Sequence, residues 1–180
     1  HRGETREAIH LMEDLETISM DDKQRLRLIE FKSLAMMKEG TFDPSPISKL
    51  LEETSNHDAA AKLSFILAQY YISSGNVESA LKMVKKSLGI AKRMEDFPLQ
   101  VSSLILLSQI YELHYDSESA LSLLEHSIQL PKISFKDKFQ ILHRISFLLE
   151  DLNRLDEAIE RMEEAEKMSE ERGNERGRDK

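Results

Sequence analysis

The amino-acid sequence predicts an all-α protein built from consecutive antiparallel helix pairs. Apolar residues recur with the 3.6-residue period of a helix, and no segment requires a β-strand. A short motif repeats at intervals of 40 and 38 residues, which is typical of helical repeat proteins. The chain of 180 residues has only 4 Pro and 6 Gly and no Trp, a composition that argues against a turn-rich β protein.

The first 57 residues are expected to form degenerate helices. Segment 4–18 contains a loose copy of the repeated motif but lacks a partner helix before it. Segments 21–39 and 46–55 are interpreted as a degenerate pair, with Gly40 near its turn and Pro46 at the start of the short second helix.

Residues 58–171 are expected to form three clear helix pairs. The motif Glu-Ser-Ala-Leu at 78–81 recurs at 118–121, and a looser copy follows at 156–159. Each copy lies in the second helix of a pair, and an apolar segment at a constant distance before it forms the first. The predicted pairs are 58–73 with 76–95, 98–114 with 117–130, and 135–151 with 154–171.

The predicted second helices begin at short polar residues and continue as apolar stripes. Asn76, either Asp116 or Ser117, and Asn153 stand where an N-cap is needed, because the first N–H groups of a helix lack partners within it. In the last helix the stripe consists of Leu155, Ala158, Ile159, Met162, Ala165 and Met168. The segment 173–180 carries two Gly among charged residues and is expected to be a frayed polar tail.

The positions of small and aromatic residues resemble the tetratricopeptide repeat (TPR) family. In the first clear unit the matching residues are Leu67, Ala68, Tyr71, Gly75 and Ala80; in the others they are Leu107, Ser108, Tyr111 and Ala120, then Ile145, Ser146, Leu149, Ala158 and Ala165. Small residues are needed because the two helices of a pair approach closely there.

These units are longer than the usual repeat of about 34 residues and lack its Trp and closing Pro, so they resemble a long-helix variant. The resemblance implies a right-handed α-α superhelix of about nine helices, in which residues 1–172 form a single solenoid.

Motifs for catalysis are absent from the sequence. There is no phosphate-binding glycine loop, no nucleophile elbow and no zinc-binding His pair, and no Cys is available as nucleophile or ligand. We therefore expect no enzyme activity, no cofactor and no metal. The net charge of −8 argues against nucleic-acid binding, and no apolar run is long enough to span a membrane. An intracellular protein is expected, in the cytoplasm, with the nucleus as the open alternative.

The resemblance to TPR proteins implies that a partner binds on the concave side, which the first helices line. Gln69 and Gln109 lie one repeat apart, and their amides could grip a peptide backbone or simply be solvated. The candidate residues of this groove are Lys62, Phe65, Gln69, Ile105, Gln109, Glu112, Gln140, His143, Arg144, Phe147 and Glu150.

Two functions remain open on the sequence alone. The first is a non-catalytic scaffold that binds a peptide or partner subunit and assists assembly of a multi-protein complex. The second is a regulatory segment that senses a ligand or peptide and controls an effector domain outside these residues. The absence of an initiator Met suggests a piece of a longer chain, and exposed end helices suggest a homo-oligomer.

Overall fold

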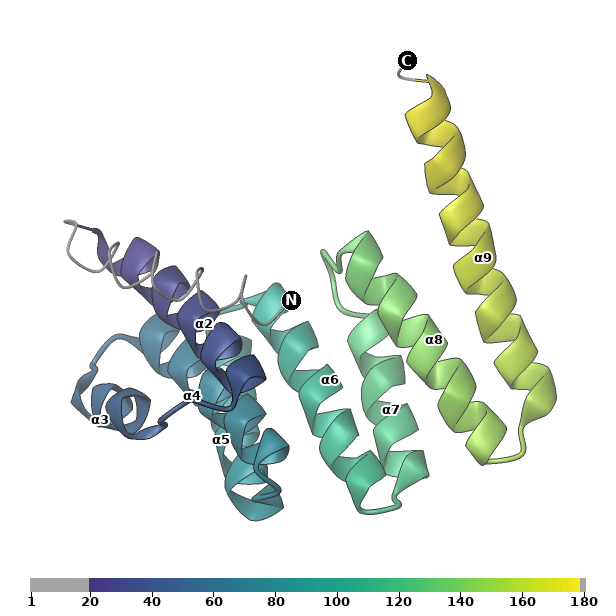
Figure 1. Ribbon diagram of the computed structural model, residues 1–180. Helices are drawn as coiled ribbons and strands as arrows, with labels where there is room; N and C mark the ends of the chain where they lie inside the picture. The colour runs from purple at the N-terminus through teal and green to yellow at the C-terminus, as the bar shows by residue number, and fades with distance from the viewer. Residues whose placement is uncertain (1–19, 179–180) are drawn as a thin grey trace. The chain divides into compact units, whose positions relative to one another are not determined.

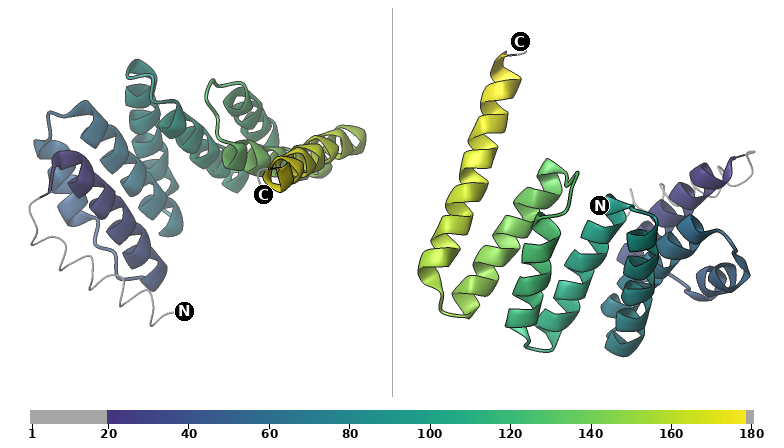
Figure 2. Two further views of the ribbon diagram at one scale, coloured as in Figure 1. Left: turned by 90° about the horizontal axis from the view of Figure 1, so that it is seen from above. Right: turned by 180° about the vertical axis from the view of Figure 1, so that it is seen from behind.

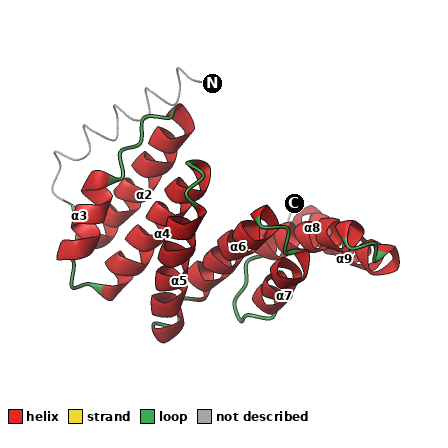
Figure 3. Cartoon of the chain, turned by 90° about the horizontal axis from the view of Figure 1, so that it is seen from below, coloured by secondary structure: helices red, strands yellow, loops and turns green. Residues whose placement is uncertain are grey.

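The chain folds into helices joined by short connections, as the sequence predicts (Figure 1, Figure 3). The computed structural model describes residues 20–178, with side chains as far as Arg172, and the predicted helix 4–18 lies outside these residues. Within 20–178 all regular structure is helical. The helices are α2 (Asp22–Glu39), α3 (Ser45–Glu53), α4 (His57–Ser73), α5 (Val77–Arg93), α6 (Phe97–Leu113), α7 (Ser117–Ile128), α8 (Phe135–Asp151) and α9 (Leu155–Arg178).

The helices form two compact units that divide between Glu95 and Asp96. In the first unit α4 pairs with α5, and α2 and α3 also pack against α4. In the second unit α6 pairs with α7 and α8 with α9, and α7 also packs against α8 (Figures 1 and 2). The expectation that residues 1–172 form one continuous solenoid remains a prediction.

Small residues lie where the helices of each pair meet. In the second helices Ala80 and Ala120 have no exposed surface, and Ala158 is 9% exposed. In the first helices Ala68, Ser108 and Ser146 are likewise buried. The two serine hydroxyls donate at 2.8 Å to the carbonyl three residues earlier in their own helix, so their burial leaves no unpaired donor.

The turns inside the three clear pairs share one backbone geometry. Gly75, Tyr115 and Asn153 all adopt the left-handed conformation, with φ of 77°, 58° and 58°. In each turn the next residue donates its N–H to the carbonyl five positions back, at 2.8, 3.0 and 2.8 Å. This arrangement satisfies a carbonyl at the end of the first helix and reverses the chain in three residues. The spacing of these turns reproduces the spacing of the sequence repeat.

The predicted N-caps are confirmed at two of three positions. The side chains of Asn76 and Asp116 accept from the N–H three residues on, both at 3.1 Å. Two hydrogen bonds from Ser119 lower the pKa of the Asp116 carboxyl, and the one from the side chain has a larger effect than the one from the backbone.

The predicted cap at Asn153 is wrong. Asn153 takes the left-handed turn position, which asparagine tolerates better than most residues, so Arg154 precedes the helix. Arg154 donates two hydrogen bonds of 2.7 Å to Glu157 in the first turn of α9. These hydrogen bonds raise the pKa of Arg154 and lower the pKa of Glu157.

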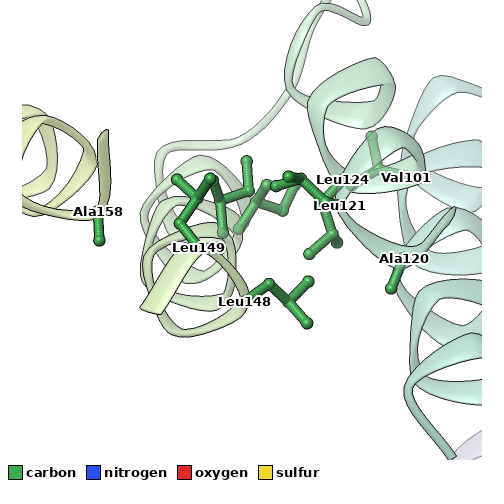
Figure 4. Close-up of a cluster of buried hydrophobic side chains, with 9 residues drawn as sticks. Val101, Ala120, Leu121, Leu124, Leu148, Leu149 and Ala158 are labelled. Carbon is green, nitrogen blue, oxygen red and sulfur yellow. The ribbon is translucent and has the colours of Figure 1, made fainter. Parts of the chain in front are cut away.

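The core of the second unit lies between neighbouring helices. Leu148 of α8 points toward Leu121 and Leu124 of α7, and Leu149 belongs to the same buried cluster (Figure 4). Ile145 of α8 joins the same cluster and is also almost completely buried. The second helix of one pair is therefore covered on two sides, by its own first helix and by the first helix of the next pair.

Helix α9 runs to Arg178, past residue 171, where the sequence pattern predicted its end. The apolar stripe stops near Met168, but the following Glu and Arg residues are good helix formers. Gly173 and Gly177 each cost about 1 kcal/mol relative to alanine, which does not end the helix here. Fraying of the segment 173–180 remains a prediction.

A tryptophan at the alanine of a helix crossing should force the pair apart. We expect Ala120→Trp to lower the free energy of unfolding by about 3 kcal/mol, because Ala120 has no exposed surface and the side chain has no room. Ser122→Trp on the exposed side of the same helix is the matched control and should have little effect. Urea unfolding followed by circular dichroism measures both; equal stability of the two variants would contradict the crossing position.

Candidate partner-binding surface

The candidate residues of the first unit lie together on α4. Lys62, Phe65 and Gln69 are all half-buried, so each presents part of its side chain to solvent. The Lys62 ammonium lies 2.8 Å from the Asp58 carboxylate one turn earlier. Its charge is thus paired within its own helix, and Phe65 and Gln69 remain as the residues of α4 available for contact.

The candidate residues of α6 have different roles. Ile105 packs against the core cluster of the second unit, so only part of its side chain is available to a partner. Gln109 is half-buried, one repeat after Gln69. Gln69 and Gln109 belong to different units, so a joint grip on one peptide remains a prediction.

An ion pair joins the first helices of the second unit. Arg144 of α8 donates from Nη2 to Glu112 Oε1 of α6 at 2.5 Å. Their side chains are 23% and 34% exposed. The Arg144 Nε is buried and lacks a hydrogen-bond partner. Because both charges are engaged with each other, this arginine is not a free clamp for a partner's carboxylate, and its first role is to connect the two pairs.

An open hollow of about 760 Å³ lies between α8 and α9. Three of the predicted groove residues, His143, Phe147 and Glu150, line it from α8. The ring of Phe139 stands edge-on against the His143 ring, with centroids 4.6 Å apart. Gln140, also on α8, is exposed to solvent outside this lining.

Phe147 is the most exposed aromatic ring of the hollow, with 62% of its surface accessible. Leu155, Ile159 and Met162 of α9 line the opposite wall and are 53%, 57% and 42% exposed. We refer to these three residues as the α9 stripe. Large exposed side chains gathered in one concave place are typical of a protein-binding surface.

The α9 stripe was not among the predicted site residues. Its members were used to predict the helix itself, and a second helix is expected to bury such a stripe. The sequence analysis expected exposed end helices, but it assigned them to contacts between copies of the chain and not to the partner-binding surface.

Neither metal binding nor a membrane span is found in the part of the chain that the structure describes. No group of three or more His, Asp or Glu side chains among residues 20–178 could hold a metal ion. No helix in the same range is both long and apolar enough to cross a bilayer.

The comparison with protein families identifies one segment directly. A tetratricopeptide repeat family model matches residues 139–172, which cover most of α8 and α9. No curated protein matches the chain. The repeat assignment therefore has direct sequence support in the last helix pair, which also contains the hollow.

Solved structures show the same fold over nearly the whole chain. One of them is a Podosopora anserina protein described as a kinesin light chain with nearly identical TPR-like repeats. Its structure is similar to that of this chain with a TM-score of 0.67 and 19% sequence identity. That match covers 96% of this chain and 90% of the other. MamA is similar with a TM-score of 0.65 and 14% identity, covering 96% and 92% of the two chains.

The apo form of RapI is similar with a TM-score of 0.71 and 18% identity. The match covers 93% of this chain but only 64% of RapI, so RapI is substantially longer than the part it shares. Together these likenesses define the class of the fold: the chain is an all-α protein of TPR-like helical repeats.

Removal of one member of the Glu112–Arg144 pair should cost more than removal of both. We expect Glu112→Ala to lower the free energy of unfolding by about 2 kcal/mol, because it leaves a half-buried guanidinium without its acceptor. Glu112→Met combined with Arg144→Met should be close to neutral, since it also removes the unpaired Nε donor.

Glu125→Ala is the matched control for this measurement. Glu125 lies 3.9 Å from Arg161 in an exposed pair, so its loss should cost less than about 1 kcal/mol. Urea unfolding of the four proteins gives the comparison. A double variant that is less stable than Glu112→Ala would show that the pair stabilises the fold by more than its apolar replacement.

Proposed function

We propose that this chain is a non-catalytic protein-interaction scaffold that binds a peptide or partner subunit and assists assembly of a multi-protein complex. Its binding surface comprises the candidate residues on the first helices, which we call the first-helix surface. The proposal includes the sequence prediction that this surface lies on the concave side of one solenoid. It also includes a cytoplasmic location and the absence of direct nucleic-acid binding.

The observation that carries the proposal is the exposure of Phe147. This ring lies on a first helix and is 62% exposed in a hollow that could accept a side chain from a partner. Aromatic side chains in such positions contribute disproportionately to binding free energy when a partner covers them. Gln69 and Gln109 add half-exposed amides, which can donate to and accept from a peptide backbone.

The resemblance to TPR repeats supports the same proposal. Stacked helix pairs provide extended surfaces that proteins of this architecture use for binding. No catalytic constellation accompanies this surface among the described residues: His143 contacts a phenylalanine ring, and Arg144 is paired with Glu112. Binding is thus the activity that these side chains are suited to perform.

The test is affinity capture with the purified chain as bait, read by quantitative mass spectrometry. The variant Gln69→Ala/Gln109→Ala/Phe147→Ala removes three contact groups without touching a fully buried residue. We expect the variant to retain the helical circular dichroism of the wild type and to capture at least tenfold less of the specific partner.

The matched control changes three exposed residues of second helices, Lys86→Ala, Ser122→Ala and Glu160→Ala. It should capture the partner as the wild type does. Equal capture by the first-helix variant and the wild type would contradict the proposed surface. Loss of the partner in both variants would show that binding does not depend specifically on the first helices, and it would contradict the proposed surface as well.

A further inference from the structure

The α9 stripe differs from the same positions one repeat earlier. A shift of 38 residues aligns α9 with α7, so Ile159 corresponds to Leu121 and Met162 to Leu124. Leu121 and Leu124 are 2% and 0% exposed, whereas Ile159 and Met162 are 57% and 42% exposed. Equivalent apolar side chains are therefore covered in one repeat and open in the next.

The difference is confined to one side of the helix. Ala158 and Ala165 of α9 face their own first helix and are 9% and 1% exposed. Their counterparts in α7, Ala120 and Ser127, are also buried. Both second helices thus pack normally within their own pairs, and only the side that meets the next first helix differs.

The chain itself shows what covers this side of α7. Helix α8 packs against α7 and contributes Ile141, Ile145 and Leu148 to the shared cluster, at the helical spacing i, i+4 and i+7. Figure 4 shows Leu148 on the side of α8 that faces Leu121. These side chains pack with Leu121 and Leu124 in a single cluster. The ligand with the matching shape for the α9 stripe is therefore an amphipathic helix with apolar residues at the same spacing.

The charges around the α9 stripe indicate whether a helix that docks there is basic or acidic. Three carboxylates, Glu150, Glu163 and Glu166, line the hollow, and its lining includes no Lys or Arg. Such a rim attracts a basic partner and repels an acidic one.

We propose that the α9 stripe is the docking site for a basic amphipathic helix of a partner protein, seated on α9 as α8 is seated on α7. This inference rests on the proposed function, because it names the class of partner that a protein-interaction scaffold of this form would accept. It assigns the binding to second-helix residues, which the first-helix variant leaves intact.

Three helix-stabilised peptides of 17 residues, the length of α8, test the proposal directly. The first carries Ile, Ile and Leu at i, i+4 and i+7 with Lys and Arg on its flanks. The second keeps the apolar residues but has Glu flanks, and the third keeps the basic flanks but has Ser in the apolar positions. Fluorescence anisotropy with the full chain should show binding of the first peptide, and at least tenfold weaker binding of the other two.

Variants of the chain locate the binding. The variant Ile159→Asp/Met162→Asp should bind the first peptide with at least tenfold lower affinity. The control Leu113→Asp, at another exposed apolar residue, should change that affinity less than twofold. Because the aspartates could disturb α9, Glu163→Lys/Glu166→Lys provides a second variant at exposed positions. It should reverse the preference, so that the Glu-flanked peptide binds better than the basic one.

Several results would overturn the proposal. These are absence of binding by the first peptide, equal binding by the Ser peptide, or affinity unchanged by Ile159→Asp/Met162→Asp. Sedimentation equilibrium of the chain alone adds another: a dimer that Ile159→Asp dissociates would assign the stripe to a second copy instead. If the peptides fail while capture still depends on Phe147, this inference falls and the proposed function stands.

Discussion

The three clear helix pairs depend on one constraint: the two helices of a pair approach closely at a small residue contributed by each helix. At Ala80 and Ala120 no surface is left exposed, so no atom could be added without moving a helix. The larger apolar residues on either side can pack only because these positions let the helix axes come together. The repeat spacing of 40 and 38 residues is the interval at which the chain meets this requirement again.

The two second helices α7 and α9 differ in how many of their sides are packed. Each second helix has one side for its own partner and another for the next pair, and α7 uses both. In α9 only the first side is covered, so Ile159 and Met162 stay open although their pattern is that of a buried stripe. A binding surface thus arises from the same apolar pattern that forms the core elsewhere in the chain.

The sequence predicted the helices well because their signals are local. Apart from the end of α9, apolar periodicity, polar caps such as Asn76 and the recurring alanine placed the helices of residues 20–178 close to their observed bounds. Asn153 was misassigned because asparagine suits both an N-cap and a left-handed turn, and only the shared turn geometry distinguishes the two. The end of α9 was placed too early because the apolar stripe ends before the helix does.

The site was less predictable than the fold because it depends on contacts between distant residues. Glu112 and Arg144 were both expected on the first-helix surface, but their pairing joins residues 32 positions apart through side-chain conformations. The periodicity of the α9 stripe predicts a buried face and does not show that Ile159 is 57% exposed, although exposed end helices were expected. Phe147 was predicted as a groove residue and is indeed exposed, since its position on α8 alone determines the side on which it lies.

Helix α7 is packed on two sides and α9 on only one, and this difference is the central claim. Hydrogen exchange of the backbone amides in these two helices tests it most directly. Amides of a helix packed on two sides open less often than those of a helix packed on one. We predict that the amides from Leu121 to Leu124 exchange at least tenfold more slowly than those from Ile159 to Met162. Addition of the basic amphipathic peptide should slow exchange from Ile159 to Met162 and so reduce this difference in rate. Equal protection of the two segments in the chain alone would contradict the account, because it would show that the α9 stripe is already covered.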